Sequence, residues 1–462
     1  LTGRHIWQIE NAGTHASSFP AKYVTFPDLL EKSGYVIGGT GKLWGPGNYE
    51  ISGRDRNPAG PEFSDITLDP PYAGINKWDY ASNFDAFLAA RPNDKPFCFW
   101  YGGKEPHRVF EKGSGLKAGK KLEEVKVPAF LPDTPEIRSD LLDYCLEIEW
   151  FDSQLGKMLR KLEAMGELEN TLIIVTSDNG MAFPRAKSNV YEYGIHMPLA
   201  IRWGAAVPGG RSVDDIVGFV DLTATILDAA SVPHPGGDYP LAGRSFMNIL
   251  ESGKSGHVDA SRDFILAGRE RHSSSRFNSL GYPQRAIRTD NYLYIRNLKP
   301  ERWPAGAPQK YDPAPKRRHF KKEDALAFKR AKPITDATLG DPFGAFQDID
   351  SSPSLSYLIE NRDDPIVKPF FELAVAMRPA EELYDIKQDP GCIHNLIDRP
   401  NYAKVAEELW AKLENELRAT GDPRMEGSDI FESYRRYSSL RYFPIPDWAK
   451  TGKVPTPNWV QR

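Results

Sequence analysis

Residues 172–180 read Leu-Ile-Ile-Val-Thr-Ser-Asp-Asn-Gly, and this stretch decides which fold the chain is expected to have. The short apolar run, rich in β-branched residues, predicts a buried parallel strand. Asp178 and Asn179 come at its carboxyl end, the edge of an open α/β sheet where ligands bind, and Gly180 lets the backbone turn. A carboxylate beside an amide oxygen suits a hard cation such as calcium. The alternative is an ordinary turn capped by an Asx side chain, because Asp-Asn-Gly is common turn chemistry.

Two further strand-like runs end in loops that carry positive or hydrogen-bonding groups. Residues 35–38 run into a glycine-rich turn that ends at Lys42, the kind of turn in which an anion can be held. Residues 97–101 form an apolar run that is followed by Gly-Gly-Lys-Glu-Pro and then by His107 and Arg108. Taken singly, Lys42 is also compatible with a surface lysine in a hairpin turn, and His107 with a surface histidine. Their positions after separate strands favour a shared site at one edge of the sheet.

The order of the expected elements predicts the fold class. Apolar residues recur at helical spacing over residues 135–165, which predicts a long amphipathic helix before the strand at 172–176. This pattern predicts an α/β fold with a large, mostly parallel or mixed sheet flanked by helices. From about residue 262 short alternating runs appear at 264–266, 284–289 and 292–295, followed by an amphipathic helix at 402–417. We therefore expect an α/β domain over residues 1–260 and a smaller C-terminal α+β subdomain, an antiparallel sheet with a helix, over residues 261–462.

Composition excludes several classes of function. The 59 Lys and Arg residues against 63 Asp and Glu residues give a net charge of −4, so we expect no nucleic-acid partner. No apolar run in the sequence reaches the length of a membrane span. Cys98, Cys145 and Cys392 form no Cys-x-x-Cys pair, so the sequence predicts no zinc site built from cysteines. The sequence does not indicate an oligomeric state.

Five segments follow one another in the same order as in the formylglycine-dependent sulfatases of the alkaline-phosphatase superfamily, and the chain resembles that family over nearly its whole length. The segments are Gly34-Tyr35 through Gly41-Lys42, Pro106-His107-Arg108, Ser177-Asp178-Asn179-Gly180, Asp221-Leu222 with Gly243-Arg244-Ser245, and Glu382-Leu383-Tyr384-Asp385 with Asn395-Leu396. The resemblance implies that residues 1–260 are a sulfatase-like catalytic domain.

The resemblance also implies roles for single residues. Asp178 and Asn179 are expected to bind Ca2+, while Lys42, His107 and Lys187 are expected to hold the sulfate oxygens. Positive groups around those oxygens would stabilise charge while a nucleophile attacks sulfur. Lys187 follows the metal strand in a loop, so its replacement is expected to change the stability of the fold little.

At one position the chain departs from the pattern of the family. The family usually has a histidine one or two residues after the signature lysine, and this chain has Leu43-Trp44 there. If that histidine normally assists the breakdown of the reaction intermediate, then His15 and His272 are the candidates for its role.

The first signature of the family, Cys-x-Pro-x-Arg, is followed a few residues later by Leu-Thr-Gly-Arg, the residues found at positions 1–4 here. The resemblance therefore implies that the formylglycine cysteine, and a pair of aspartates that bind the metal, precede this stretch. We expect the catalytic domain to be incomplete at its N-terminus and the 462-residue fragment to be inactive by itself.

The resemblance implies a sulfuric ester or sulfamate hydrolase that acts on a sulfated saccharide derived from a glycosaminoglycan such as heparan sulfate. Residues 177–191 align without gaps to the sulfamidase-like branch, which acts on N-sulfoglucosamine, whereas residues 194–198 resemble a broader set of sugar sulfatases. The choice between N- and O-sulfate stays open. A secreted, periplasmic or lysosomal location is also implied. The alternatives are a phosphomonoester, phosphodiester or phosphonate hydrolase of the same superfamily, and a non-catalytic sugar-binding relative, which Trp44 favours.

Overall fold

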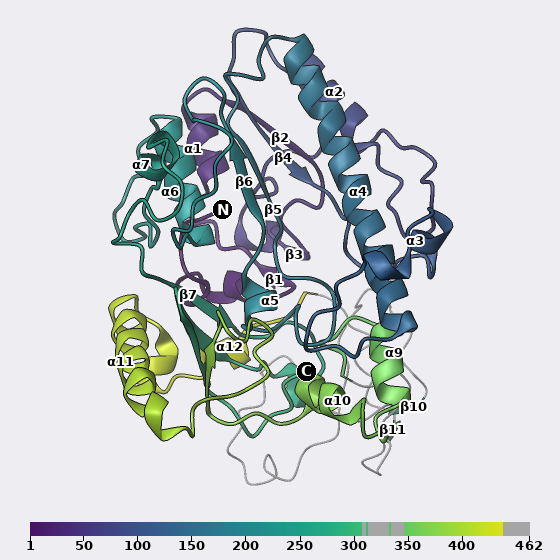
Figure 1. Ribbon diagram of the computed structural model, residues 1–462. Helices are drawn as coiled ribbons and strands as arrows, with labels where there is room; N and C mark the ends of the chain where they lie inside the picture. Colours follow the sequence, from purple (N-terminus) through teal and green to yellow (C-terminus); the bar gives the residue numbers. More distant parts are fainter. Residues whose placement is uncertain (307–310, 313–331, 334–345, 438–462) are drawn as a thin grey trace.

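The computed structural model of the chain describes residues 1–306, 311–312, 332–333 and 346–437. Its upper part in Figure 1 is built from strands that lie between two groups of helices, and its lower part from a separate antiparallel sheet. The elements of the upper part are β1 (Ser17–Ser18), α1 (Phe26–Lys32), β2 (Val36–Gly41), β3 (Gly47–Asn48), α2 (Tyr80–Ala90), β4 (Phe97–Gly102), α3 (Ser114–Lys117), α4 (Pro135–Ala164), β5 (Ile173–Thr176), α5 (Glu192–Ile195), β6 (Leu199–Arg202), α6 (Phe219–Ala229) and α7 (Met247–Glu251).

The strands that carry the expected site lie in two small sheets. β2 pairs with β4 in parallel, and β5 pairs with β6 in antiparallel orientation. The prediction that residues 172–176 form a buried parallel strand is therefore wrong on both points, because β5 is antiparallel to its neighbour and only half-buried. The partial burial has a physical reason, since residues of β4 and β5 line a cavity of about 2010 Å³. The antiparallel direction comes from the pairing of β5 with β6.

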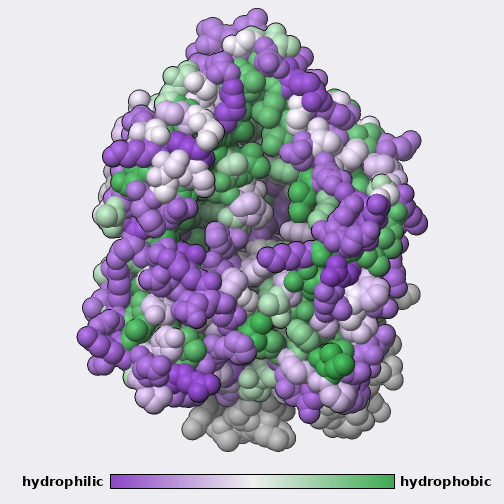
Figure 2. All heavy atoms as spheres, in the orientation of Figure 1, coloured by the Kyte–Doolittle hydropathy of each residue, from purple (hydrophilic) through white to green (hydrophobic). Residues whose placement is uncertain are grey.

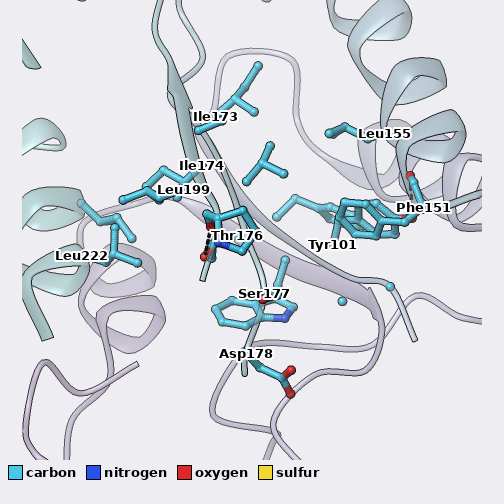
Figure 3. Close-up of a pocket in the computed structure, with 18 of the residues that line it drawn as sticks. Tyr101, Phe151, Leu155, Ile173, Ile174, Thr176, Ser177, Asp178, Leu199 and Leu222 are labelled. Atoms are coloured by element: carbon cyan, nitrogen blue, oxygen red, sulfur yellow. Dashed lines mark hydrogen bonds between the residues drawn. The ribbon is translucent and has the colours of Figure 1, made fainter. Parts of the chain in front are cut away.

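Side chains from both sides converge on this cavity. In Figure 3, Ile173, Ile174 and Leu199 lie on one side of it, and Tyr101, Phe151 and Leu155 on the other. The space-filling view shows a hollow in the middle of this face, with hydrophobic residues gathered on its upper wall (Figure 2). The site at the carboxyl ends of the strands thus has an apolar cavity behind it.

The long helix predicted over residues 135–165 is confirmed as α4. The Thr134 side chain accepts a hydrogen bond from the amide of Ile137, and Pro135 occupies the first turn, where its missing N–H is no loss. The inner side of α4 packs Met158 and Leu162 against α2 and β4 in one buried apolar cluster. In the described part of the chain, the helices are too short or too polar to span a lipid bilayer.

A buried acid on α4 makes the stability of the fold depend on pH. Glu147 is 2% exposed, and its Oε2 has no hydrogen-bond partner among the described residues. Burial, together with the nearby carboxylates of Glu105 and Asp143, raises the pKa of Glu147 to about 8. The folded state therefore holds a proton that the unfolded state has already released, and stability falls as the pH rises from about 4.5 to about 8.

Replacing Glu147 by glutamine is expected to remove this pH-dependent loss, because the amide stays neutral. Above about pH 8 the variant should be more stable than the parent protein by on the order of 1–4 kcal/mol, since each pKa unit corresponds to about 1.4 kcal/mol. Urea unfolding followed by circular dichroism at several pH values measures the difference. Glu163→Gln, at an exposed position of the same helix, is the control. Parallel curves of stability against pH for Glu147→Gln and the parent would contradict the assignment.

The lower part of the molecule confirms the predicted antiparallel sheet with a helix. Its strands follow the order β12-β9-β8-β7, all antiparallel, and the apolar side of α11 packs on them through Leu409, Leu413 and Leu417. Its elements are β7 (Phe264–Arg269), β8 (Gln284–Thr289), β9 (Tyr292–Asn297), β10 (Tyr311–Asp312), β11 (Lys332–Pro333), α9 (Pro353–Glu360), α10 (Lys368–Val375), β12 (Glu381–Asp385), α11 (Ala403–Ala419) and α12 (Ile430–Ser433).

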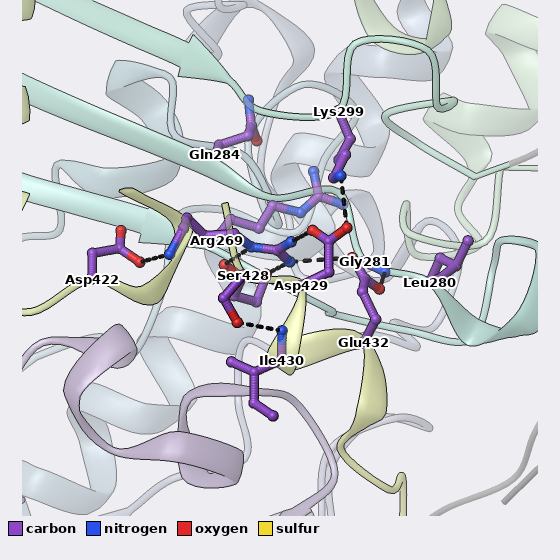
Figure 4. A network of polar contacts seen from close by, with 12 residues as sticks. Arg269, Leu280, Gly281, Gln284, Lys299, Asp422, Ser428, Asp429, Ile430 and Glu432 are labelled. Carbon is purple, nitrogen blue, oxygen red and sulfur yellow. Dashed lines mark hydrogen bonds and ion pairs between the residues drawn. The ribbon is translucent and has the colours of Figure 1, made fainter. Parts of the chain in front are cut away.

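A buried network of charges joins this sheet to the segment that follows α11. The Arg285 side chain is fully buried and donates to Asp422 at 2.5 Å and to Glu270 at 2.8 Å. Figure 4 shows the carboxylates of this region gathered around the basic side chains, with Lys299 on Asp429 at 2.9 Å. Buried charges need such partners, because an unpaired one is strongly destabilising. The network therefore fixes the segment between β7 and β8, which reaches the candidate site.

Candidate functional site

Three connections bring the predicted residues to one end of the cavity. Lys42 follows β2 directly, and His107 lies in the loop after β4. β2 and β4 are parallel, and the amide of Lys42 donates to the carbonyl of Gly102 at 2.6 Å, so both connections begin at the same edge. Asp178 and Asn179 follow β5, and all four residues line the cavity together with Lys187.

Lys42 and Asp178 form an ion pair across this end of the cavity. Lys42 Nζ lies 2.5 Å from Asp178 Oδ2, and the two side chains are 37% and 63% exposed. Desolvation raises the pKa of the Asp178 carboxyl, but the charge and hydrogen bond of Lys42 outweigh it and hold that pKa below the ordinary value. Figure 3 shows Asp178 below Ser177, beyond the end of the strand. The carboxylate is therefore ionised and accessible.

The turn after β5 requires glycine at its third position. The Gly180 amide donates to the carbonyl of Gly194 at 3.2 Å, and a Cβ at position 180 would lie only 1.9 Å from the carbonyl oxygen of Tyr193. Asn179 Nδ2 donates to the carbonyl of Gly180 at 2.8 Å. This close approach fixes the direction in which Asp178 and Asn179 leave the strand.

Asp178 and Asn179 fit only part of a calcium site. Their carboxylate and amide oxygens are of the type that calcium prefers, but the ion takes about six to eight oxygen ligands. Within the described ranges, no three His, Cys, Asp or Glu side chains come together in a way that could hold a metal. The described side chains thus offer oxygens suited to one side of a calcium shell and would not complete it.

Lys187 is buried and paired with a residue that the sequence did not point to. The lysine is 9% exposed, and its Nζ lies 2.6 Å from Asp350 Oδ2. Burial raises the pKa of Asp350, but the Lys187 ammonium outweighs it and lowers that pKa below the ordinary value. The expectation that its replacement changes stability little is not supported by this environment, since removing a buried ammonium leaves its carboxylate partner unpaired. No local motif marks Asp350, which lies 163 residues away along the chain.

His107 presents one defined ring nitrogen to the site. Its Nδ1 lies 2.6 Å from the carbonyl oxygen of Arg108, which can only accept, so Nδ1 carries the proton and Nε2 is left for a ligand. Burial and the nearby Lys187 ammonium lower the pKa of His107. The ring is therefore neutral near pH 7 when the site holds no anion.

Arg108 holds the His107 loop in place through buried hydrogen bonds. Its guanidinium donates to both carboxylate oxygens of Asp140 on α4, at 2.7 and 2.8 Å, and to the carbonyl of Ala182 at 2.7 Å. One buried arginine thus ties the His107 loop both to α4 and to the loop that carries Lys187. The sequence singled out the His-Arg pair, and the structure gives the arginine a supporting position instead of one facing the ligand.

Two histidines lie beside Lys187, and the sequence named both as candidates for a vacant role. The rings of His15 and His272 are 5.0 Å apart, and His272 Nδ1 lies 2.8 Å from the hydroxyl of Ser188, the residue after Lys187. Burial, then His272, Arg436 and the two site lysines lower the pKa of His15 to about 2. Two residues after Lys42, where the family usually has a histidine one or two residues on, Trp44 packs edge-on against Phe19 with 5.3 Å between the ring centroids.

The assembled groups are of the types that bind small oxyanions in proteins. Two ammonium groups and a hydrogen-bonding histidine lie at one end of an open cavity, and each ammonium is held by one carboxylate. Positive groups placed in this way repel one another unless negative charge lies among them, and here Asp178 and Asp350 supply that charge. An anionic ligand at this place would therefore compete with the two carboxylates for the ammonium groups.

Comparison with known proteins gives a consistent set of relatives. Residues 4–232 match the family model described as Sulfatase. The chain is 25% identical over 365 residues to human N-sulphoglucosamine sulphohydrolase, with 72% of this chain and 62% of the relative covered. It is 26% identical over 300 residues to an ulvan-active sulfatase of Formosa agariphila, with 64% and 41% covered. The chain therefore spans less than two thirds of the length of these curated relatives.

A solved structure extends the likeness to the fold. The structure described as a complex with its substrate D-glucosamine-2-N,6-O-disulfate superposes with a TM-score of 0.57 at 19% sequence identity, over 94% of this chain and 90% of the other. At this identity the likeness concerns the fold, which agrees with the predicted mixed α/β architecture.

Proposed function

The chain carries a domain of the sulfatase family over residues 4–232, and from this premise we propose that the protein hydrolyses a sulfate ester or sulfamate on a sulfated sugar of the glycosaminoglycan type. The observation that supports the proposal most is the gathering of Lys42, His107 and Lys187 at the carboxyl end of β2, β4 and β5. Names of relatives that act on N-sulfoglucosamine or ulvan agree with a sulfated sugar as substrate.

We assign separate tasks to these residues. The Lys42 and Lys187 ammonium groups bind sulfate oxygens and offset the charge that grows there during transfer. His107 offers Nε2 to a further oxygen, with its tautomer fixed by the Arg108 carbonyl. Asp178 and Asn179 contribute two oxygen ligands to a calcium ion, which when bound would add a positive charge beside the sulfate. The geometry of the described residues supports a site of this kind without completing the metal shell.

The division into residues 1–260 and 261–462 also stays a proposal. The contact of Lys187 with Asp350 supports a site to which both parts contribute. From the family resemblance we further propose a secreted, periplasmic or lysosomal location.

We expect the 462-residue polypeptide to bind sulfated glucosamine without releasing sulfate. Binding follows from the cluster of cations, and the lack of turnover from the three cysteines of the chain, none of which lies in a Cys-x-Pro-x-Arg sequence. Isothermal titration calorimetry with N-sulfoglucosamine, glucosamine 6-sulfate and unsulfated glucosamine measures binding, and ion chromatography measures free sulfate.

The comparison among ligands separates the candidate functions. Stronger binding of either sulfated sugar than of glucosamine supports the proposal, and the better of the two indicates N- or O-sulfate. Preference for glucosamine 6-phosphate over the 6-sulfate would favour a phosphoester hydrolase. Equal binding of glucosamine and its sulfates would favour a sugar-binding protein, and metal-dependent release of sulfate by this polypeptide would contradict the expected lack of turnover.

A further inference from the structure

His272 is held at the back of the anion site by a buried carboxylate. It lies in the segment between β7 and β8, where it is the half-buried residue in a run, 271–276, whose other members are buried. Its Nδ1 lies 2.8 Å from Ser188 Oγ and 3.5 Å from Asp348 Oδ1. The Ser188 hydroxyl can donate or accept, whereas the Asp348 carboxylate only accepts, so both groups can accept from Nδ1–H once the ring is protonated.

Asp348 is itself fixed by strong partners. It is 2% exposed and accepts hydrogen bonds from Arg269 at 2.5 Å, from Ser275 at 2.7 Å, and from Arg276 and Ser273. Burial raises the pKa of Asp348, but the charges of Arg276 and Arg269 outweigh it and hold that pKa well below the ordinary value. Asp348 is therefore a permanent negative charge that orients the His272 ring.

The contact of His272 reaches the anion site through a strained residue. Ser188 has a φ of +64°, a left-handed conformation that is unfavourable for serine, and it directly follows Lys187. The hydrogen bond to His272 lies on the side chain of this residue. A change in the charge of His272 therefore acts on Ser188, the residue next to Lys187.

We propose that sulfate binding at Lys187 is coupled to the uptake of a proton through the Asp348–His272–Ser188 chain. His272 is the positioning residue that takes up this proton. The proposal rests on the proposed function. An anion beside Lys187 offsets the positive charge that His272 otherwise faces, while Asp348 stabilises the imidazolium that forms. The protonated ring then adds a further positive charge near Lys187.

The charges around His272 agree with this coupling. Burial lowers its pKa, Asp348 raises it, and the charges of Lys187 and Arg269 lower it. Three groups from other segments also lie near the ring. The ring centroid of His15 is 5.0 Å from that of His272, and Arg436 donates to the His272 carbonyl at 3.3 Å. The third group is Asp350, the partner of Lys187. Bound sulfate favours the protonated form of His272 over the neutral form. The affinity of the site for sulfate therefore rises as the pH falls through the pKa that His272 has in the sulfate-bound state.

The test is calorimetric titration of inorganic sulfate into the parent chain and into His272→Gln. Glutamine keeps a hydrogen-bonding group but cannot take up a proton. Titrations in two buffers of different ionisation heat give the number of protons taken up for each sulfate bound. We expect His272→Gln to lose most of this uptake and up to about tenfold in affinity at acidic pH, one pKa unit being equivalent to a factor of ten, with little change at alkaline pH.

Two further variants and one spectroscopic measurement keep the outcome clear. His257→Gln, on an exposed histidine 3.8 Å from Asp290, is the matched control and should retain full proton uptake. If His15→Gln and not His272→Gln removes the uptake, or if both retain it, the assignment to His272 is wrong. If His272→Gln does not fold, the pKa of the His272 ring in the parent, followed by NMR, must rise when sulfate replaces chloride. Absence of sulfate binding at every pH would instead refute the proposed function.

Discussion

Replacing Lys187 by alanine is expected to weaken the binding of sulfate by roughly tenfold to a hundredfold, because a charge-assisted hydrogen bond is lost. In any preparation that turns over sulfate esters, catalytic efficiency should fall by about a hundredfold or more, as for the loss of one group that stabilises the transition state. The lysine is 9% exposed and held at 2.6 Å by Asp350, so its ammonium would be fixed in position before a ligand binds. Calorimetry with inorganic sulfate measures the loss of affinity.

The same change is expected to destabilise the fold by about 1–3 kcal/mol, since the Asp350 carboxylate is left in a partly buried place without its partner. The double variant Lys187→Ala, Asp350→Asn separates the two effects, because it removes the unpaired charge and should regain most of the stability without regaining affinity. Near-normal sulfate binding by Lys187→Ala would mean that Lys187 is a structural residue.

Replacing Asp140 by alanine is expected to destabilise the fold by about 3–5 kcal/mol, because it leaves the Arg108 guanidinium buried without its carboxylate. The two side chains are 3% and 1% exposed and share two hydrogen bonds of 2.7 and 2.8 Å. Ser354 of α9 also donates to Asp140, so the change affects the lower part of the molecule as well. Urea unfolding measures the loss of stability.

A matched control lies at the start of the same helix. Asp133 pairs with Arg138 at 2.5 Å, but its side chain is 57% exposed, and such surface pairs contribute little because water screens them. Asp133→Ala should therefore cost much less than Asp140→Ala. Because Arg108 follows His107, Asp140→Ala should also weaken sulfate binding under conditions in which the variant is folded. Equal stabilities for the two variants would contradict the role given to the buried pair.

Elements with a strong local signal were predictable from the sequence. α4 follows from the helical spacing of its apolar residues and from Thr134 and Pro135 at its start, and β8 has the same limits, Gln284–Thr289, as the predicted strand. In both, the hydrophobic period and the flanking turn residues are properties of neighbouring residues, so a short window of sequence contains them.

The pairing of β5 could not be read in the same way. An apolar run is compatible with a parallel or an antiparallel neighbour, and its burial depends on what lies beside it in space. The structure pairs β5 with β6, and residues of both strands line the cavity. A local pattern contains neither fact.

The residues of the candidate site were likewise predictable only where a local sequence pattern marks them. Lys42, His107, Asp178 and Asn179 could be found because each follows a strand, and the resemblance added Lys187; their roles stay predictions. Asp350 could not be found, since a carboxylate that pairs with a lysine 163 residues earlier leaves no pattern in its own neighbourhood. The same is true of Asp348, whose partners Arg269, Arg276 and His272 lie more than 70 residues before it.

The most direct measurement is a crystal structure with selenate, a tetrahedral anion like sulfate whose selenium can be located by anomalous scattering. The proposal that Lys42, His107 and Lys187 form one oxyanion site predicts a selenium position with oxygens in hydrogen-bonding reach of all three side chains, near Asp178. The Lys187→Ala variant should lose this peak at the same selenate concentration. Selenate bound elsewhere, or bound in contact with only one of the three groups, would contradict the proposed site.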